Sequence, residues 1–87
     1  MTLNEILNQA GRSLEDIKEI YHGRDHACRC GCCGNYFDRG SRGFTRAINQ
    51  MNKPEFKNYE VNAPEGKNYI NISYDDYNDK CYCVYFN

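Results

Sequence analysis

Three segments in the last third of the chain alternate polar and apolar residues, and this pattern constrains the fold more than any other sequence feature. They span residues 58–62, 68–74 and 80–86, and the turn-forming runs Ala63–Gly66 and Asp75–Asp79 separate them. Alternation with a period of two, bounded by turn residues, is typical of half-buried strands. The second run is too short for an EF-hand calcium loop. The sequence therefore predicts three antiparallel strands in consecutive order.

The first part of the chain carries helical signals instead. Thr2 and Glu5 have the spacing of a capping box at the start of a short helix that ends at Gly11. Ser13 is a capping residue for a second segment, which predicts another helix ending at Gly23. The apolar residues of this segment recur at helical spacing: Leu14, Ile17, Ile20 and Tyr21.

A third helix is predicted from about Gly43 to Asn52, before Pro54. Its apolar face consists of Phe44, Ala47, Ile48 and Met51. Glycine-rich sequence precedes this helix, and two short strands, 27–29 and 35–37, are predicted there around the turn Gly31–Gly34. We therefore expect one α+β domain spanning residues 1–87. Short helices would cover one face of a three- to five-stranded antiparallel sheet, with a Cys/Gly-rich hairpin at its edge.

Six cysteines in 87 residues would suggest a disulfide scaffold in a secreted chain. The opening residues Met1–Glu5 show no basic leader followed by an apolar run, so we expect a cytoplasmic protein with reduced thiols. Four cysteines crowd into one stretch: Cys28, Cys30, Cys32 and Cys33. Their spacing allows a structural zinc site completed by Cys81 and Cys83, but a Cys-x-Cys pair on a strand holds its two sulfurs apart. We favour small buried thiols that pack the hairpin, and predict no cofactor.

The formal net charge of −1 hides a positive middle section, because residues 24–46 carry five arginines and two aspartates. Arg39, Arg42 and Arg46 are three and four residues apart, so they line one side of the third helix if it begins early. Gly40 and Gly43 allow the backbone to approach a ligand. An anion site is favoured slightly over the alternative, a solvated basic face.

Catalysis has little support in the sequence. His22 or His26 would have to activate a thiolate within a crowded cysteine cluster, and the P-loop and dinucleotide-binding patterns are missing. We therefore predict that the protein is not an enzyme. Tyrosines recur on both faces of the expected sheet, so the face away from the helices is expected to be an aromatic stacking platform or a dimer surface.

Three runs of the sequence, Tyr21–Tyr36, Arg42–Ala47 and Tyr69–Ser73, resemble a class of small bacteriophage proteins of the early, host-takeover type. Within this class the chain is similar to anti-defence proteins that counter Thoeris immunity. Those proteins act as sponges, sequestering signals of the cyclic ADP-ribose type in pockets between subunits. The resemblance implies a homo-oligomeric viral protein in the host cytoplasm. It would bind a small nucleotide signal stoichiometrically, without catalysis and without membrane contact.

The resemblance also implies roles for single residues. The three arginines at 39, 42 and 46 would pair with the diphosphate, while Phe44 or a sheet tyrosine would stack on the adenine. The ligand-binding residues expected on this basis are Arg24, Arg29, Tyr36, Arg39, Arg42, Phe44, Arg46 and Tyr74.

Two alternatives remain open at the level of sequence. One is a protein-binding inhibitor of a host defence enzyme, comparable to an anti-CRISPR, which would ignore nucleotides and form a stable complex with its target. The other is a small zinc module that binds nucleic acid, and chelation would unfold it.

Overall fold

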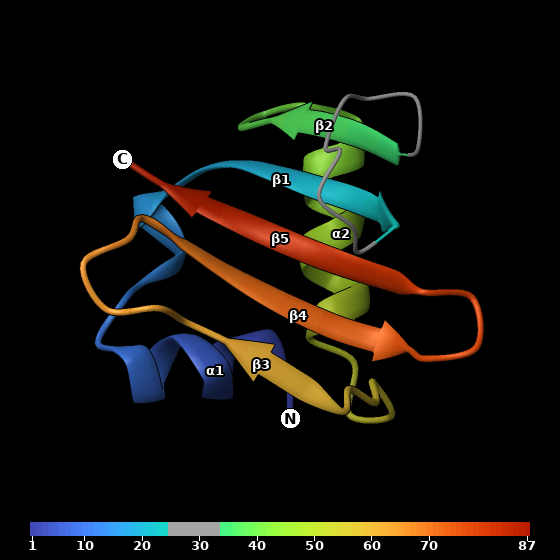
Figure 1. Ribbon diagram of the computed structural model, residues 1–87. Helices are drawn as coiled ribbons and strands as arrows, with labels where there is room; N and C mark the ends of the chain where they lie inside the picture. The colour runs from blue at the N-terminus through green and yellow to red at the C-terminus, as the bar shows by residue number, and fades with distance from the viewer. Residues whose placement is uncertain (25–33) are drawn as a thin grey trace.

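The computed structural model describes residues 1–24 and 34–87. The described elements are α1 (Leu3–Ala10), a 3-10 turn (Leu14–Asp16), β1 (Ile17–Arg24), β2 (Gly34–Asp38), α2 (Arg42–Met51), β3 (Glu60–Asn62), β4 (Tyr69–Asp75) and β5 (Lys80–Phe86). The strands form one antiparallel sheet in the order β2-β1-β5-β4-β3 (Figure 1). The α+β class and the antiparallel sheet are thus confirmed.

The first helix begins and ends as its sequence predicts. The Glu5 backbone N–H donates to Thr2 Oγ1 at 3.3 Å, and the Thr2 N–H donates to Glu5 Oε1 at 2.8 Å. The hydrogen bond from the Thr2 backbone lowers the pKa of Glu5. Gly11 ends the helix with a φ of 70°, in the left-handed region. No helix in the described residues is long and apolar enough to cross a membrane.

Residues 17–24 form a strand, so the prediction of a second helix ending at Gly23 is wrong. The register of β1 against β5 shifts at its start: Ile17 lies opposite Phe86, but Glu19 lies opposite Tyr85. This β-bulge inserts one residue and brings Ile17 and Ile20, three positions apart, onto the same buried face. The helical spacing in the sequence therefore reflects a bulged strand.

The predicted strand 35–37 is confirmed as part of β2, but its partner is β1. In this pair, Phe37 lies opposite Ile20 and Tyr36 opposite Tyr21. The other half of the predicted hairpin, residues 27–29, lies outside the described residues. So do Cys28, Cys30, Cys32 and Cys33 and the zinc site considered for them.

The three strands of the last third are confirmed in consecutive order, with β4 between β3 and β5. The run 76–79 forms the turn between β4 and β5. The Asn78 amide and backbone N–H donate to the Asp75 carboxylate, and these hydrogen bonds lower the pKa of Asp75.

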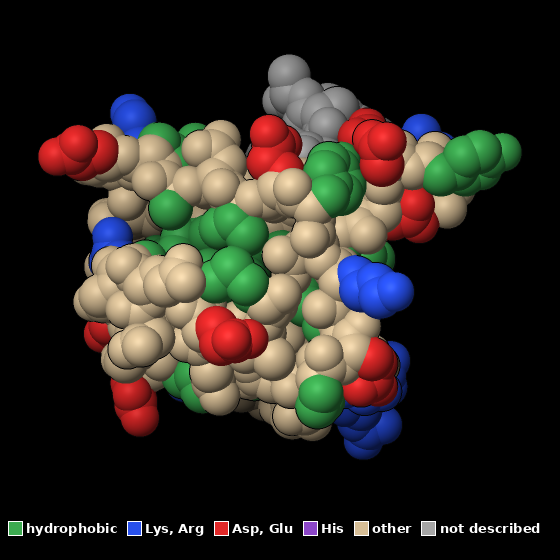
Figure 2. Space-filling view, turned by 90° about the horizontal axis from the view of Figure 1, so that it is seen from below, with side chains coloured by type: hydrophobic (Ala, Val, Ile, Leu, Met, Phe, Trp, Pro, Cys, Tyr) green, Lys and Arg blue, Asp and Glu red, His purple; other side chains and the backbone are tan. Residues whose placement is uncertain are grey.

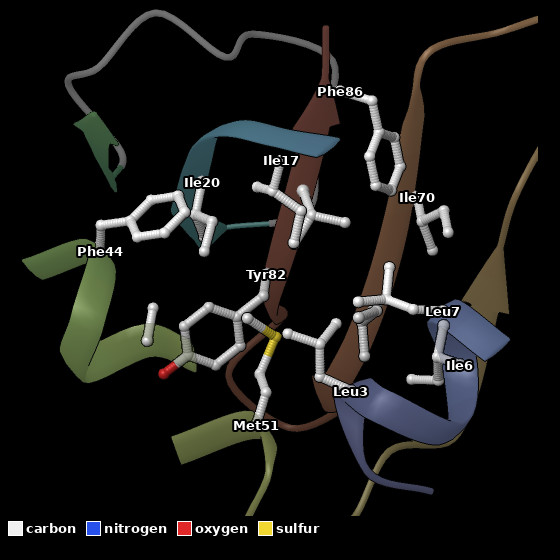
Figure 3. Close-up of a cluster of buried hydrophobic side chains, with 13 residues drawn as sticks. Leu3, Ile6, Leu7, Ile17, Ile20, Phe44, Met51, Ile70, Tyr82 and Phe86 are labelled. Atoms are coloured by element: carbon white, nitrogen blue, oxygen red, sulfur yellow. The ribbon is translucent and has the colours of Figure 1, made fainter. Parts of the chain in front are cut away.

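Both helices pack on the same face of the sheet and enclose the main core with it (Figure 3). The helices contribute the buried residues Leu3, Ile6, Leu7, Phe44, Ala47 and Met51. The strands contribute Ile17, Ile20, Ile70, Ile72, Tyr82, Val84 and Phe86. In Figure 3 the Tyr82 ring lies beside Met51, between the sheet and α2. The core thus places α2 against β1 and β2.

The opposite face of the sheet is not the open aromatic platform that the sequence predicts. Its central side chains are fully buried: Tyr21, Ser73, Cys81 and Cys83. Tyr69 and Tyr85 are half-buried against this cluster. Tyr36 remains 40% exposed on the edge strand β2.

Candidate ligand-binding groove

The outward side of α2 forms an open groove of about 670 Å³, which we call the α2 groove. Its lining residues are Gly40, Ser41, Arg42, Thr45, Arg46, Asn49, Gln50 and Lys53. Three of these residues are cationic and none is acidic. Ser41 caps the helix, because its Oγ accepts from the Phe44 backbone N–H at 3.2 Å. The α2 groove therefore offers a local positive field to an anion.

A second cavity of about 320 Å³ lies where α2 meets the sheet, and we call it the aromatic pocket. Its lining residues are His22, Phe37, Gly43, Arg46, Ala47, Gln50 and Tyr82. Arg46 and Gln50 line both cavities, so the pocket and the groove are neighbours across one turn of α2. Gly43 is required here, because an added Cβ would collide with the Phe37 ring.

Stacked aromatic rings build the sheet side of the aromatic pocket. The His22 ring of β1 stacks on the Tyr82 ring of β5, with centroids 4.1 Å apart and planes 10° apart. Tyr74 of β4 also stacks on Tyr82, with ring centroids 5.2 Å apart, and its hydroxyl lies 2.6 Å from His22 Nε2. Phe56 packs beside Tyr74 at 5.9 Å. His22, Tyr82 and Tyr74 thus form a continuous row across β1, β5 and β4, with Phe56 packed beside it.

The electrostatics of this row keep it uncharged at neutral pH. Burial, and then the positive charge of Lys80, lower the pKa of His22 below its ordinary value. Burial, together with the neighbouring Tyr82 and Asp75, raises the pKa of Tyr74 to about 12. The Tyr74 phenol therefore keeps its proton, and its hydroxyl forms a hydrogen bond with Nε2 of the neutral His22 ring.

Arg39 does not join Arg42 and Arg46, so the predicted line of three arginines is wrong. The helix begins at Arg42, and Arg39 precedes it and lines a different cavity, with Leu14 and Phe44. Its Nε donates to the Ile17 carbonyl at 2.6 Å, and its guanidinium also donates to the Leu14 carbonyl. Arg39 thus ties the start of α2 to the segment that leads into β1.

None of the other predicted residues in the described part of the chain lines the α2 groove or the aromatic pocket. Phe44 is 6% exposed in the core, under the Arg39 guanidinium, so its ring does not face the groove. Tyr36 lies on the opposite face of the sheet, and exposed Arg24, at the end of β1, lines neither cavity. Tyr74 reaches the aromatic pocket only through its contacts with His22 and Tyr82. Arg29 lies outside the described residues.

Sequence reasoning did not place Phe37, Gln50 or Tyr82 in a ligand site. Gln50 follows Arg46 by four residues on the same side of α2, and this spacing was a usable signal. His22 was considered only as a catalytic base. Its orientation toward α2 follows from strand alternation after the bulge, which the helical interpretation of residues 14–22 concealed.

Comparisons with protein-family models, with curated proteins and with solved structures find no match for this chain. The groove is therefore interpreted from its own geometry. Cationic side chains at one end and stacked rings at the other suit a ligand that carries both an anionic group and a flat ring.

Proposed function

We propose that this chain is a non-catalytic binding protein that sequesters a small nucleotide signal of the cyclic ADP-ribose type. In this proposal it acts in the host cytoplasm as a bacteriophage anti-defence protein. The phosphates occupy the α2 groove and a base enters the aromatic pocket. The protein acts stoichiometrically, so its affinity must exceed that of the host effector for the same signal.

One observation supports this proposal above the others: the cationic groove and the aromatic pocket share Arg46 and Gln50. A single ligand that spans both cavities would contact these two side chains with its central part. The two volumes, about 670 and 320 Å³, lie within the range of small-molecule sites.

The charge of the groove favours phosphate over a neutral group. Arg42 and Arg46 lie one helical turn apart, and Lys53 extends the positive charge past the end of α2. Arginine can bind two phosphate oxygens at once through its planar guanidinium. Because all three side chains are exposed, we expect the affinity to fall steeply with added salt.

The row of rings favours binding without chemistry. His22 Nε2 is engaged by the Tyr74 hydroxyl, and its ring face is covered by Tyr82. A general base must reach the proton that it removes from a substrate. His22 instead forms a wall of the aromatic pocket, against which the nucleobase of the ligand can pack.

The proposal predicts that ADP-ribose-type nucleotides raise the melting temperature and are released unchanged from the denatured protein. A ligand at one hundred times its dissociation constant stabilises the folded state by about 2.7 kcal/mol. Calorimetric titration of purified protein should give a dissociation constant that rises about tenfold or more in Arg46→Ala, which removes a side chain common to both cavities. Mass spectrometry of the released ligand tests for cleavage.

Lys67→Ala is the matched control, since it removes one exposed positive charge outside both cavities. It should bind like the native chain. Arg39→Ala separates the stabilising role of Arg39 from the ligand-binding role of Arg42 and Arg46. It should lower the melting temperature and leave the affinity for nucleotide unchanged. Nucleotide titrations without heat at any salt concentration would refute the proposal. A stable complex with a host defence enzyme, isolated in a separate binding experiment, would then favour the protein-binding inhibitor.

A further inference from the structure

Exposed apolar side chains gather around β3, the last strand of the sheet. Of the five large hydrophobic residues that are exposed in the described part of the chain, three lie here: Met1, Tyr59 and Val61, which are 44%, 53% and 38% exposed. Figure 2 views this side of the molecule, from below the sheet of Figure 1, and shows hydrophobic side chains gathered in a patch. Such a concentration on a small surface is typical of an interaction site.

A shallow apolar cavity of about 220 Å³ continues the patch between α1 and β3. Its lining residues are Met1, Ile6, Gln9, Ala10, Val61, Ala63 and Ile70. The Asn58 amide donates to the Met1 carbonyl at 2.7 Å and fixes the start of the chain beside β3. We call this cavity, with Tyr59 and the outer edge of β3, the β3 surface.

We propose that a second copy of this chain binds the β3 surface, so that two β3 strands pair antiparallel across a two-fold axis through Val61. This register sets Val61 opposite its own copy, Tyr59 opposite Ala63 and Glu60 opposite Asn62. Strand alternation then collects the apolar side chains on the side of α1 and the Glu60–Asn62 pairs on the other.

The neighbouring registers are less favourable. An axis through Glu60 sets two carboxylates directly opposite each other, which is destabilising. An axis through Asn62 sets Glu60 opposite Pro64, which has no N–H for a strand pair. The register through Val61 avoids both problems, and its self-complementarity selects a second copy as the occupant.

The interface is independent of the proposed nucleotide site. The apolar cavity shares no lining residue with the α2 groove or the aromatic pocket. A dimer formed through β3 therefore leaves both cavities of each copy open. Because the strand has three residues, the contact is small, and we expect a reversible dimer that dissociates on dilution.

Sedimentation equilibrium of the full chain, over a range from low micromolar to near-millimolar concentration, measures this dimer directly. Val61→Lys should raise its dissociation constant about tenfold or more, because two like charges then meet at the axis. Tyr77→Lys adds the same charge at a side chain that is 96% exposed on the β4–β5 turn, and it should leave the dimer intact. Circular dichroism and melting curves confirm that each variant folds.

Position 62 tests the register itself. Asn62→Lys places two cations opposite the two Glu60 carboxylates and should strengthen the dimer, whereas Asn62→Glu should weaken it. Combining Asn62→Glu with Glu60→Lys pairs opposite charges again and should bring the dissociation constant back to the native value or below it. The proposal is overturned by a native chain that stays monomeric at the highest concentration, by Val61→Lys dimerising as the native chain does, or by the two Asn62 variants shifting the equilibrium in the same direction.

Discussion

The side chain of His22 contacts residues of two other strands and lines the aromatic pocket. It stacks on Tyr82, forms a hydrogen bond with the Tyr74 hydroxyl and lines the aromatic pocket beside α2, so it connects β1, β5 and β4. The half-buried position of the ring disfavours its charged form. Burial and the charge of Lys80 both act against protonation. The residue therefore links the proton concentration to the stability of the site.

The lowered pKa of His22 predicts that stability falls in mild acid. Above the ordinary histidine pKa of about 6.5 the ring is neutral in the folded and unfolded states, and its stabilising contribution is fully present. Below that pH the unfolded chain takes up the proton first, so the contribution is lost as pH falls through the folded pKa. The melting temperature, measured at a series of pH values from about 7.5 down to about 5, should fall over this range. His22→Gln should remove part of the slope, and an unchanged slope in that variant would contradict the assignment.

At the scale of the elements, the joint between α2 and β2 depends on a missing side chain. Gly43 lies in the first turn of α2, directly over the Phe37 ring. In an exposed helix, replacing glycine by alanine stabilises by about 1 kcal/mol. Here the added Cβ cannot fit unless the helix or the ring moves, so close packing decides the outcome.

Gly43→Ala should therefore destabilise the fold, by about 1–3 kcal/mol in denaturant unfolding, against its helix propensity. Thr45→Ala is the matched control, because Thr45 is exposed on the same helix and this change should be neutral or slightly stabilising. Phe37→Leu combined with Gly43→Ala should recover part of the loss, since the smaller side chain yields space. A Gly43→Ala variant more stable than the native chain would show that the packing between α2 and Phe37 leaves room for a methyl group.

The elements also show what local sequence can and cannot predict. Both helices and β3, β4 and β5 follow from caps, turns and periodicity, because each signal is complete within its own segment. β1 does not, because the bulge at its start gives Ile17 and Ile20 a helical spacing. The groove was predicted only in part, because local sequence does not show which side chains turn toward tertiary partners. Arg42 and Arg46 share a helix, whereas Arg39 and Phe44 turn toward partners that are distant in sequence or buried.

At the scale of the whole molecule, the sheet order joins the two ends of the chain. β5 is the middle strand of the sheet and β1 is one of its two neighbours, and they pair along their length, from Arg24 opposite Lys80 to Ile17 opposite Phe86. β2 pairs with β1, α2 packs against β1 and β2, and β4 pairs with β5 and carries β3. We therefore expect the chain to unfold as one unit, with no part of the sheet stable alone.

Ile20→Ala tests this expectation, because Ile20 is fully buried on β1 between β2 and β5. Removing a buried isoleucine side chain costs about 2–5 kcal/mol, which is a large share of the total stability of a small domain. Unfolding followed by far-ultraviolet circular dichroism and by tyrosine fluorescence should give coincident transitions, both shifted to lower denaturant. Tyr77→Ala, on the exposed turn, should shift neither. If the two probes separate in Ile20→Ala, part of the sheet holds together without β1, and the central pair is not the element on which the rest depends.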